Sequence, residues 1–190
     1  MSATSSLRRG FLAVVPPTVV VRSLDDALEP VRAAAPPRLT WTRQSQWHFT
    51  VRFLGPVHDV HALLGAVGER VVDVPVFTAG LGGTGAFPSA RSASVVWVGL
   101  DEGADAMAAL AAAVGRATEP IGYPPERQSF TPHLTVARAR RPLPVGSLLA
   151  SIGAGPFGRA WDVREVVLFE SDTRSTGAVH REIAAVPLGA

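Results

Sequence analysis

The sequence predicts an α+β fold with antiparallel sheets, and three observations support this prediction. Segments with strand character alternate with helical ones, but many neighbouring strands are joined by connections of hairpin length, whereas parallel strands need longer crossovers. The pattern His, apolar, Thr, apolar occurs twice, 85 positions apart, at His48 and His133. A chain of 190 residues with a hydrophobic content of 47% is long and apolar enough for one folding unit with a buried core. We therefore expect a single domain over residues 1–190, built as two pseudo-symmetric lobes around a central cleft.

Four segments have the periodicity or the composition of helices. The first begins near Thr18 and ends before the pair Pro36-Pro37, and the second begins at Asp59, a residue type that caps helix N-termini. The third is rich in alanine, and the fourth is short. The predicted helices span residues 19–34, 59–71, 104–117 and 145–152.

The strands are shorter apolar segments bounded by glycine, proline or polar residues. They are predicted over residues 10–15, 39–42, 47–54, 76–81, 94–100, 133–137, 164–169 and 179–186. The stretch GLGGTGAFP at residues 80–88 is predicted to be a flexible hairpin connection because of its glycines, and residues 173–177 are predicted to be the turn between the last two strands.

The composition excludes some classes of function and location. The pI of about 10.3 reflects a formal net charge of only +2, carried by 18 arginines and no lysine, so it is weak evidence for nucleic-acid binding. Without cysteine the chain forms no disulfide and no thiolate metal site, which is compatible with a reducing compartment.

The pair Arg8-Arg9 before an apolar run resembles an export signal, but Pro16-Pro17 ends that run early. We expect a cytoplasmic protein with no membrane span, since no run of about 18 apolar residues occurs.

The repeated tetrapeptide is the main functional signal. In a strand, residues i and i+2 point to one face, so His48 shares a face with Thr50, and His133 shares one with Thr135. Two histidines suit displacement at phosphorus, because one imidazole can activate the attacking oxygen while the other protonates the leaving oxygen. The threonine hydroxyls can donate hydrogen bonds to the phosphoryl oxygens. This chemistry needs no metal and no cofactor, and none is expected.

These motifs, with their flanks, resemble a known family. HFTV and HLTV match the paired His-x-Thr-x motifs of the 2H phosphoesterase superfamily. The flanks RGFLAVV, HFTVRFLG, GAFPSARSASVVWVGL, FTPHLTVAR and VVLFES are similar to its RNA 2′,3′-cyclic phosphodiesterase branch, also called the 2′-5′ RNA ligase family. The resemblance covers nearly the whole chain.

The resemblance implies a bilobal α+β fold and metal-independent hydrolysis of RNA 2′,3′-cyclic phosphate ends to 2′-phosphomonoesters, with reversible 2′-5′ ligation as a further possibility. By their positions in the two motifs, His48 and His133 match the acid/base pair of the family. Thr50 and Thr135 match the residues that bind the phosphoryl oxygens.

The resemblance also implies a pair of substrate-binding residues. Phe53 and Arg138 match the positions that sandwich the terminal base, a role that suits an aromatic ring and a guanidinium plane. Strict strand alternation puts both on the core side, opposite their histidines, so this role requires a bend or a bulge in each strand. His180 stands where family members often have tyrosine.

Other functions and sites were weighed against this one. A non-catalytic RNA-end binder is less consistent with two titratable pairs, and a small cyclic nucleotide or ADP-ribose cyclic phosphate is an alternative substrate. The pair His58 and His61 is better explained by a solvated helix start than by a metal site. Arginines 138, 140 and 141 are a cluster suited to an RNA backbone or to solvent. The expected partner is RNA, and the expected state is a monomer.

Overall fold

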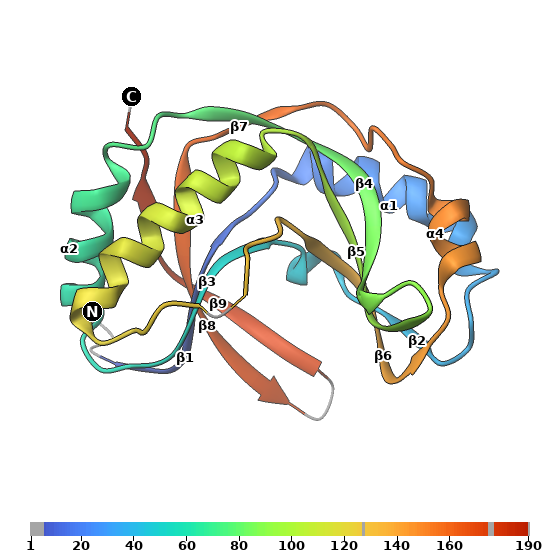
Figure 1. Cartoon of the computed structure of the whole chain (residues 1–190), viewed down its shortest axis with the longest axis horizontal. Coiled ribbons are helices and arrows are strands. Elements are labelled where there is room, and N and C mark those ends of the chain that lie inside the picture. The colour runs from blue at the N-terminus through green and yellow to red at the C-terminus, as the bar shows by residue number, and fades with distance from the viewer. Residues whose placement is uncertain (1–5, 127, 175–176, 190) are drawn as a thin grey trace.

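The structure is a computed structural model that describes residues 6–126, 128–174 and 177–189 (Figure 1). The helices are α1 (Thr18–Arg32), α2 (Val60–Val71), α3 (Ala104–Thr118) and α4 (Gly146–Ile152), with short 3-10 turns η1 (Gln44–Gln46) and η2 (Glu119–Ile121). The strands are β1 (Leu7–Val14), β2 (Leu39–Trp41), β3 (Phe49–Val57), β4 (Phe77–Ser89), β5 (Ser92–Glu102), β6 (Leu134–Leu143), β7 (Trp161–Val163), β8 (Glu165–Arg174) and β9 (Gly177–Pro187).

Within the described residues, nine strands form one antiparallel sheet. Its order is β7-β4-β5-β6-β3-β1-β8-β9, and β2 pairs with β6 beside this path. Strands β3 and β6 are joined by a single residue pair, Phe49 with Leu134. This junction divides the sheet into a first lobe (β3, β1, β8 and β9) and a second lobe (β7, β4, β5, β6 and β2). The predicted α+β class with antiparallel pairing is confirmed.

Each lobe has its own pair of helices. Helix α2 packs on α3 and β9, and α3 packs on β3, whereas α1 packs on α4 and α4 on β4. Figure 1 shows α2 and α3 on one side of the molecule and α1 and α4 on the other. The helices bury their apolar stripes, as in α1, where Val20, Leu24, Leu28 and Val31 are buried at helical spacing. The helix-covered face of the sheet is therefore the core face, and the opposite face is left for the cleft.

Helix α2 begins where the sequence predicts it to begin. The Asp59 carboxylate accepts a hydrogen bond from the Ala62 backbone N–H at 2.9 Å, which confirms the predicted N-cap. His58 and His61 flank this cap and are exposed.

The prediction of a hairpin connection over residues 80–88 is wrong. These residues belong to β4, which pairs with β5 along nearly its whole length and turns only after Ser89. The glycines serve close packing in the strand: a Cβ at Gly85 would overlap the indole ring of Trp97 on β5. Gly83, with φ of +69°, lies at a register shift, where the left-handed region suits glycine. Glycine here marks a tightly packed, bulged strand.

Two further predictions concern the C-terminal part of the chain. The short strand β7 was not predicted; it pairs with β4 through Trp161, Asp162 and Val163. In the predicted turn over residues 173–177, β8 continues to Arg174 and β9 begins at Gly177. Residues 175–176 lie outside the described residues.

The N-terminal apolar run lies in a strand, β1, as predicted. This strand also includes the pair Arg8-Arg9. None of the helices in the described part of the chain is long and apolar enough to cross a membrane.

Candidate active site

The single pair between β3 and β6 brings the two motifs together. In an antiparallel ladder, the residues on either side of a pair also lie opposite each other. Since Phe49 pairs with Leu134, His48 lies beside Thr135 and Thr50 lies beside His133. Phe49 and Leu134 are fully buried on the core face, so the four motif side chains share the opposite face. The local arrangement is two-fold symmetric, with each histidine next to the other motif's threonine.

A β-bulge follows the motif in β3. Consecutive residues of β1 pair with Thr50 and Arg52, so Val51 is an extra residue in this strand. Val51 and Arg52 are both buried, and Phe53 then returns to the face of the histidine with 67% of its surface exposed. The bulge reverses the side that strict alternation gives for Phe53.

The same irregularity occurs at the equivalent place in β6. Consecutive residues of β5 pair with Thr135 and Ala137, which makes Val136 the extra residue. Val136 and Ala137 are both buried, and Arg138 is exposed on the face of the motif. The sequence analysis required a bend or a bulge in each strand, and each strand has a bulge at the same distance from its histidine.

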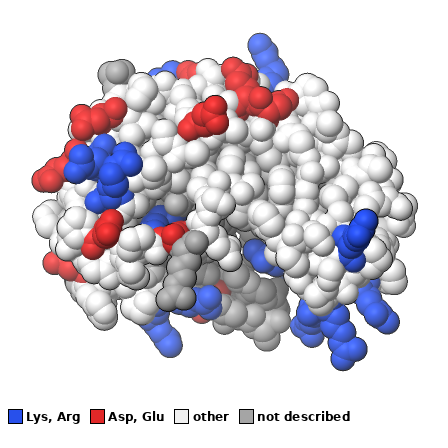
Figure 2. All heavy atoms as spheres, in the orientation of Figure 1, with Lys and Arg blue, Asp and Glu red and all other residues white. Residues whose placement is uncertain are grey.

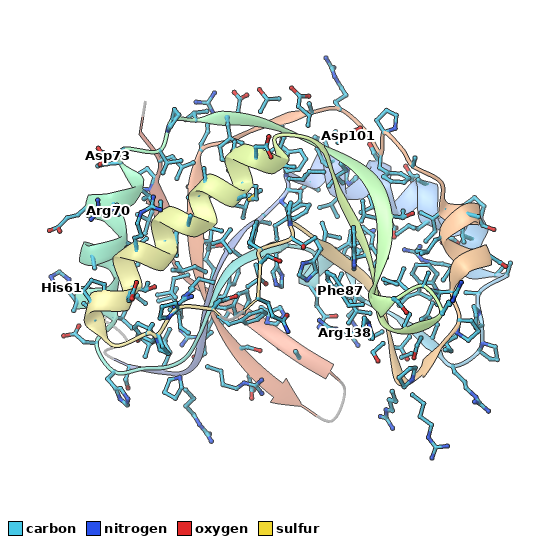
Figure 3. The ribbon with its side chains drawn as sticks, viewed as in Figure 1. His61, Arg70, Asp73, Phe87, Asp101 and Arg138 are labelled. Atoms are coloured by element: carbon cyan, nitrogen blue, oxygen red, sulfur yellow. The ribbon has the colours of Figure 1, made fainter. Side chains whose placement is uncertain are left out.

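All six predicted site residues line one cavity of about 520 Å³, a volume typical of small-ligand sites. Its walls come from β1, β3, β6, β8 and β9 and from the segment before β3. The lining residues are Arg9, Gly10, Phe11, Thr42, Gln46, His48, Thr50, Phe53, Gly55, His133, Thr135, Arg138, Ser171, Ala178 and His180. Figure 3 shows Arg138 and Phe87 in the middle of the molecule, whereas His61 and Arg70 lie far from it on α2.

The His133 ring is held by its backbone and by aromatic neighbours. Its Nδ1 lies 2.8 Å from the carbonyl oxygen of Thr131, so this nitrogen carries the proton and donates it. The Phe87 ring packs edge-on against the imidazole at 5.0 Å between centroids. With Nδ1 occupied, Nε2 is the nitrogen available to a ligand.

The His48 ring has a similar anchor in a more enclosed setting. It also hydrogen-bonds the backbone two residues earlier, at Gln46, and it packs against Phe11 at 4.9 Å between ring centroids. The pKa of His48 is lowered to about 4, first by burial and also by charge repulsion from His180, Arg138 and His133, while the Gln46 hydrogen bond opposes the shift. His48 is therefore neutral near pH 7 in the empty site.

His180 lies directly against His48, a contact that the sequence analysis did not foresee. The two rings meet edge to face at 5.2 Å between centroids, and His180 packs on Phe11 in the same way at 5.0 Å. The His180 Nδ1 is buried without a hydrogen-bond partner among the described residues. Burial, followed by repulsion from Arg138, lowers the pKa of His180.

Replacing His180 by glutamine is expected to raise the pKa of His48, because the amide cannot carry the positive charge that repels the imidazolium. The pKa should stay below the ordinary value of 6.5, since burial remains the larger cause. NMR titration of the histidine ring protons measures this directly. His61→Gln on α2 is the matched control and should leave the titration of His48 unchanged; an equal shift in both variants, or none in His180→Gln, contradicts the contact described here.

Two other residues support the site and were missed by sequence reasoning. The Thr42 hydroxyl donates to the Thr135 carbonyl oxygen at 2.8 Å and accepts from the Trp47 indole at 2.9 Å, which ties β2 and β6 to the start of β3. The Gln46 amide donates to the Ala178 carbonyl oxygen at 2.6 Å. No local sequence pattern marks such residues, because their partners are distant along the chain.

Arg52 is a third residue that sequence reasoning missed, and it owes its position to the bulge. It is buried, with 4% of its surface exposed, and its guanidinium donates to the carbonyl oxygens of Tyr123 and Pro124 at 3.0 and 2.5 Å. It also lies 3.8 Å from the Glu126 carboxylate. Arg52 thus anchors the loop after η2 to the back of the strand that carries the first motif.

His58 and His61 are not joined by a third metal-binding side chain in the part of the chain that the structure describes. No group of three histidine, cysteine or acidic side chains is placed there to hold a metal ion.

The family model described as the 2′-5′ RNA ligase superfamily matches residues 17–174. The chain belongs to this superfamily. It is similar to the protein named RNA 2′,3′-cyclic phosphodiesterase from Aeropyrum pernix, which is 33% identical over 145 residues, covering 74% of this chain and 81% of the relative. A protein of the same name from Aquifex aeolicus is 26% identical over 157 residues, covering 78% of this chain and 81% of the relative.

Solved structures have the same fold. TT0787 of Thermus thermophilus superimposes with a TM-score of 0.80 at 26% identity, covering 95% of this chain and 97% of that one. LigT of E. coli, solved with 3′-AMP, has a TM-score of 0.75 at 21% identity, covering 96% and 98% of the two chains, and supports the fold alone.

Proposed function

We propose that this protein is an enzyme that hydrolyses RNA 2′,3′-cyclic phosphate ends to 2′-phosphomonoesters, with two histidines as its acid/base pair. The single β3–β6 pair is the observation that carries the proposal, because it sets two imidazoles and two hydroxyls around one point on the cleft face. The names of the superfamily relatives, RNA 2′,3′-cyclic phosphodiesterase, support the substrate.

The reaction requires a base and an acid on opposite sides of phosphorus. One histidine takes a proton from water as the water oxygen attacks phosphorus. The bond between phosphorus and the 3′ oxygen breaks, and the other histidine gives its proton to that oxygen, which leaves a 3′-hydroxyl and a 2′-phosphate. The two-fold relation of His48 and His133 supports this division of roles, since related groups approach a central phosphate from opposite sides.

The threonines stabilise the charge that develops on the phosphoryl oxygens. Thr50 and Thr135 lie beside the histidines on the same face, where their hydroxyls can donate to the non-bridging oxygens. The bound phosphate also changes the histidines, because a nearby anion favours the imidazolium. Substrate binding therefore raises the pKa of His48 from its low value in the empty site and allows it to carry a proton.

The terminal base is proposed to lie between Phe53 and Arg138. The two bulges support this assignment, since they return both side chains to the cavity that holds the histidines. An exposed phenyl ring and a guanidinium plane provide stacking surfaces for any base.

The same site suits the ligation that the superfamily name describes. A ribose 5′-hydroxyl in the place of water would attack the same phosphorus and form a 2′-5′ linkage, with the proton transfers unchanged. Hydrolysis is the proposed main reaction because water is always in excess.

The identity of the product tests the proposed function. An oligoribonucleotide with a 2′,3′-cyclic phosphate is incubated with the purified protein, and phosphorus NMR distinguishes the two possible phosphomonoesters. A 2′-phosphate is expected, because the 3′ oxygen is the leaving group. A 3′-phosphate as the product contradicts the proposed leaving group, and an unchanged cyclic phosphate supports a non-catalytic binding protein.

A further inference from the structure

The charges of this protein are strongly segregated along the chain. Residues 30–58, 74–100 and 127–161 contain ten of the 18 arginines and none of the 16 acidic residues. The rest of the chain has eight arginines and all 16 acidic residues. The small net charge of +2 is therefore the sum of a positive set of segments and a negative remainder.

The acid-free segments build most of the sheet of the second lobe. They supply β2, β4 and β6 completely, together with most of β5 and the helix α4; they also supply β3 of the first lobe, whereas β7 contains Asp162. In Figure 2 the acidic side chains gather over the upper and left parts of this face, whereas the charged side chains of the lower right part are basic. The second lobe therefore presents a positive surface beside the cleft.

Three arginines of this lobe form a row that leads out of the cavity. Strand β2 pairs with β6 so that Leu39 lies opposite Ala139, and both are buried on the core face. On the other face Arg138 lies opposite Thr40, and Arg38 and Arg140 are the two residues that follow the last pair of this ladder, Leu39 with Ala139. The row begins in the cavity, at Arg138, and runs along the β2–β6 edge.

The two outer arginines of this row have no partner within the described part of the chain. Neither Arg38 nor Arg140 forms a hydrogen bond or an ion pair there, and both are exposed. By contrast, Arg32 is paired with Asp25 and Glu29. Like-charged side chains placed side by side without a counter-ion are a surface suited to a polyanion.

The side of the cavity next to β8 and β9 has charges of both signs nearby. Arg9 of β1 lines the cavity there, and on β8 the Glu170 carboxylate binds the Arg181 guanidinium at 2.7 Å. The segments that carry the arginine row contain no acidic residue.

We infer that Arg38 and Arg140 bind the backbone phosphates of the nucleotides 5′ to the cyclic end, so that the substrate is a single-stranded oligonucleotide. The inference rests on the proposed function for the position of the terminal nucleotide. A 2′,3′-cyclic phosphate closes the 3′ end of a strand, so the chain continues from the terminal ribose in the 5′ direction. The arginine row provides the positive path for it next to Arg138.

Binding of a fluorescent hexaribonucleotide with a 2′-phosphate end, measured by anisotropy at several salt concentrations, tests the inference without requiring catalysis. The double variant Arg38→Gln/Arg140→Gln is expected to bind roughly tenfold more weakly at about 50 mM salt. Its plot of log affinity against log salt should be shallower by about 1.4, the value for two lost contacts with a single strand. The advantage of the hexanucleotide over a competing nucleoside 2′-phosphate should fall by the same factor.

The matched control is Arg70→Gln/Arg116→Gln, which removes two exposed arginines from α2 and α3 and changes the net charge equally. It should keep the salt dependence of the wild type. Equal weakening in both double variants overturns the inference, because net charge alone then explains the effect. Unchanged hexanucleotide binding in Arg38→Gln/Arg140→Gln overturns it as well. If the wild type binds the hexanucleotide in this way but hydrolyses no cyclic phosphate, the proposed reaction is wrong, whereas the inference that Arg38 and Arg140 bind the RNA backbone is supported.

Discussion

Replacing either motif histidine by alanine is expected to lower turnover on a 2′,3′-cyclic phosphate by on the order of 10² to 10⁴-fold. His48→Ala and His133→Ala each remove one of the two proton transfers, and water replaces a positioned imidazole poorly in either role. Steady-state rates on one oligonucleotide substrate, at saturating concentration, measure the loss in kcat.

The threonine variants and a distant histidine provide the controls. Thr50→Ala and Thr135→Ala should cost less than the histidine changes, because water can partly replace a lost hydrogen-bond donor. His61→Ala, at an exposed position on α2, should turn over as the wild type does. A folded His48→Ala or His133→Ala variant with wild-type kcat contradicts the two-histidine mechanism.

Removing either proposed stacking residue is expected to weaken substrate binding by roughly 1–3 kcal/mol, with little preference among the four bases. Phe53→Ala removes the phenyl ring, and Arg138→Ala removes the guanidinium plane. Arg138→Lys keeps the charge but loses the plane, so it should behave more like the alanine variant than like the wild type. The dissociation constants of a 2′-phosphate nucleotide series give these differences.

Thermal unfolding separates this role from a structural one. Because Phe53 has 67% of its surface exposed, its loss should change the melting temperature little. If both alanine variants bind normally and melt several degrees lower, the two side chains belong to the packing of the protein. If Arg138→Lys binds as the wild type does, the contact is electrostatic and not a stack.

The sequence was most informative where a pattern repeats. The two His-x-Thr-x motifs predicted a shared face for each histidine and threonine, and the structure adds the single Phe49–Leu134 pair that joins them. Alternation also showed that Phe53 and Arg138 needed an irregular strand, but it did not distinguish a bend from a bulge. That choice depends on pairing with neighbouring strands, which no local pattern encodes.

The errors of the sequence reading have a common physical cause. Glycines in residues 80–88 predicted a turn, yet at Gly85 the lack of a side chain makes room for Trp97 of the neighbouring strand. His180 and Thr42 reach the site through β9 and through the segment before η1, outside both motifs. Long-range packing decides such positions, and a sequence without its partners in space does not reveal them.

The dependence of the initial rate on metal ions tests the central claim most directly. Hydrolysis of a 2′,3′-cyclic-phosphate oligonucleotide is measured before and after exhaustive treatment of the protein with excess chelator, and again after divalent metal ions are added back. An acid/base pair of histidines predicts the same rate in all three conditions. A complete loss of activity in chelator that is restored by a divalent metal would contradict the account and indicate a metallophosphoesterase.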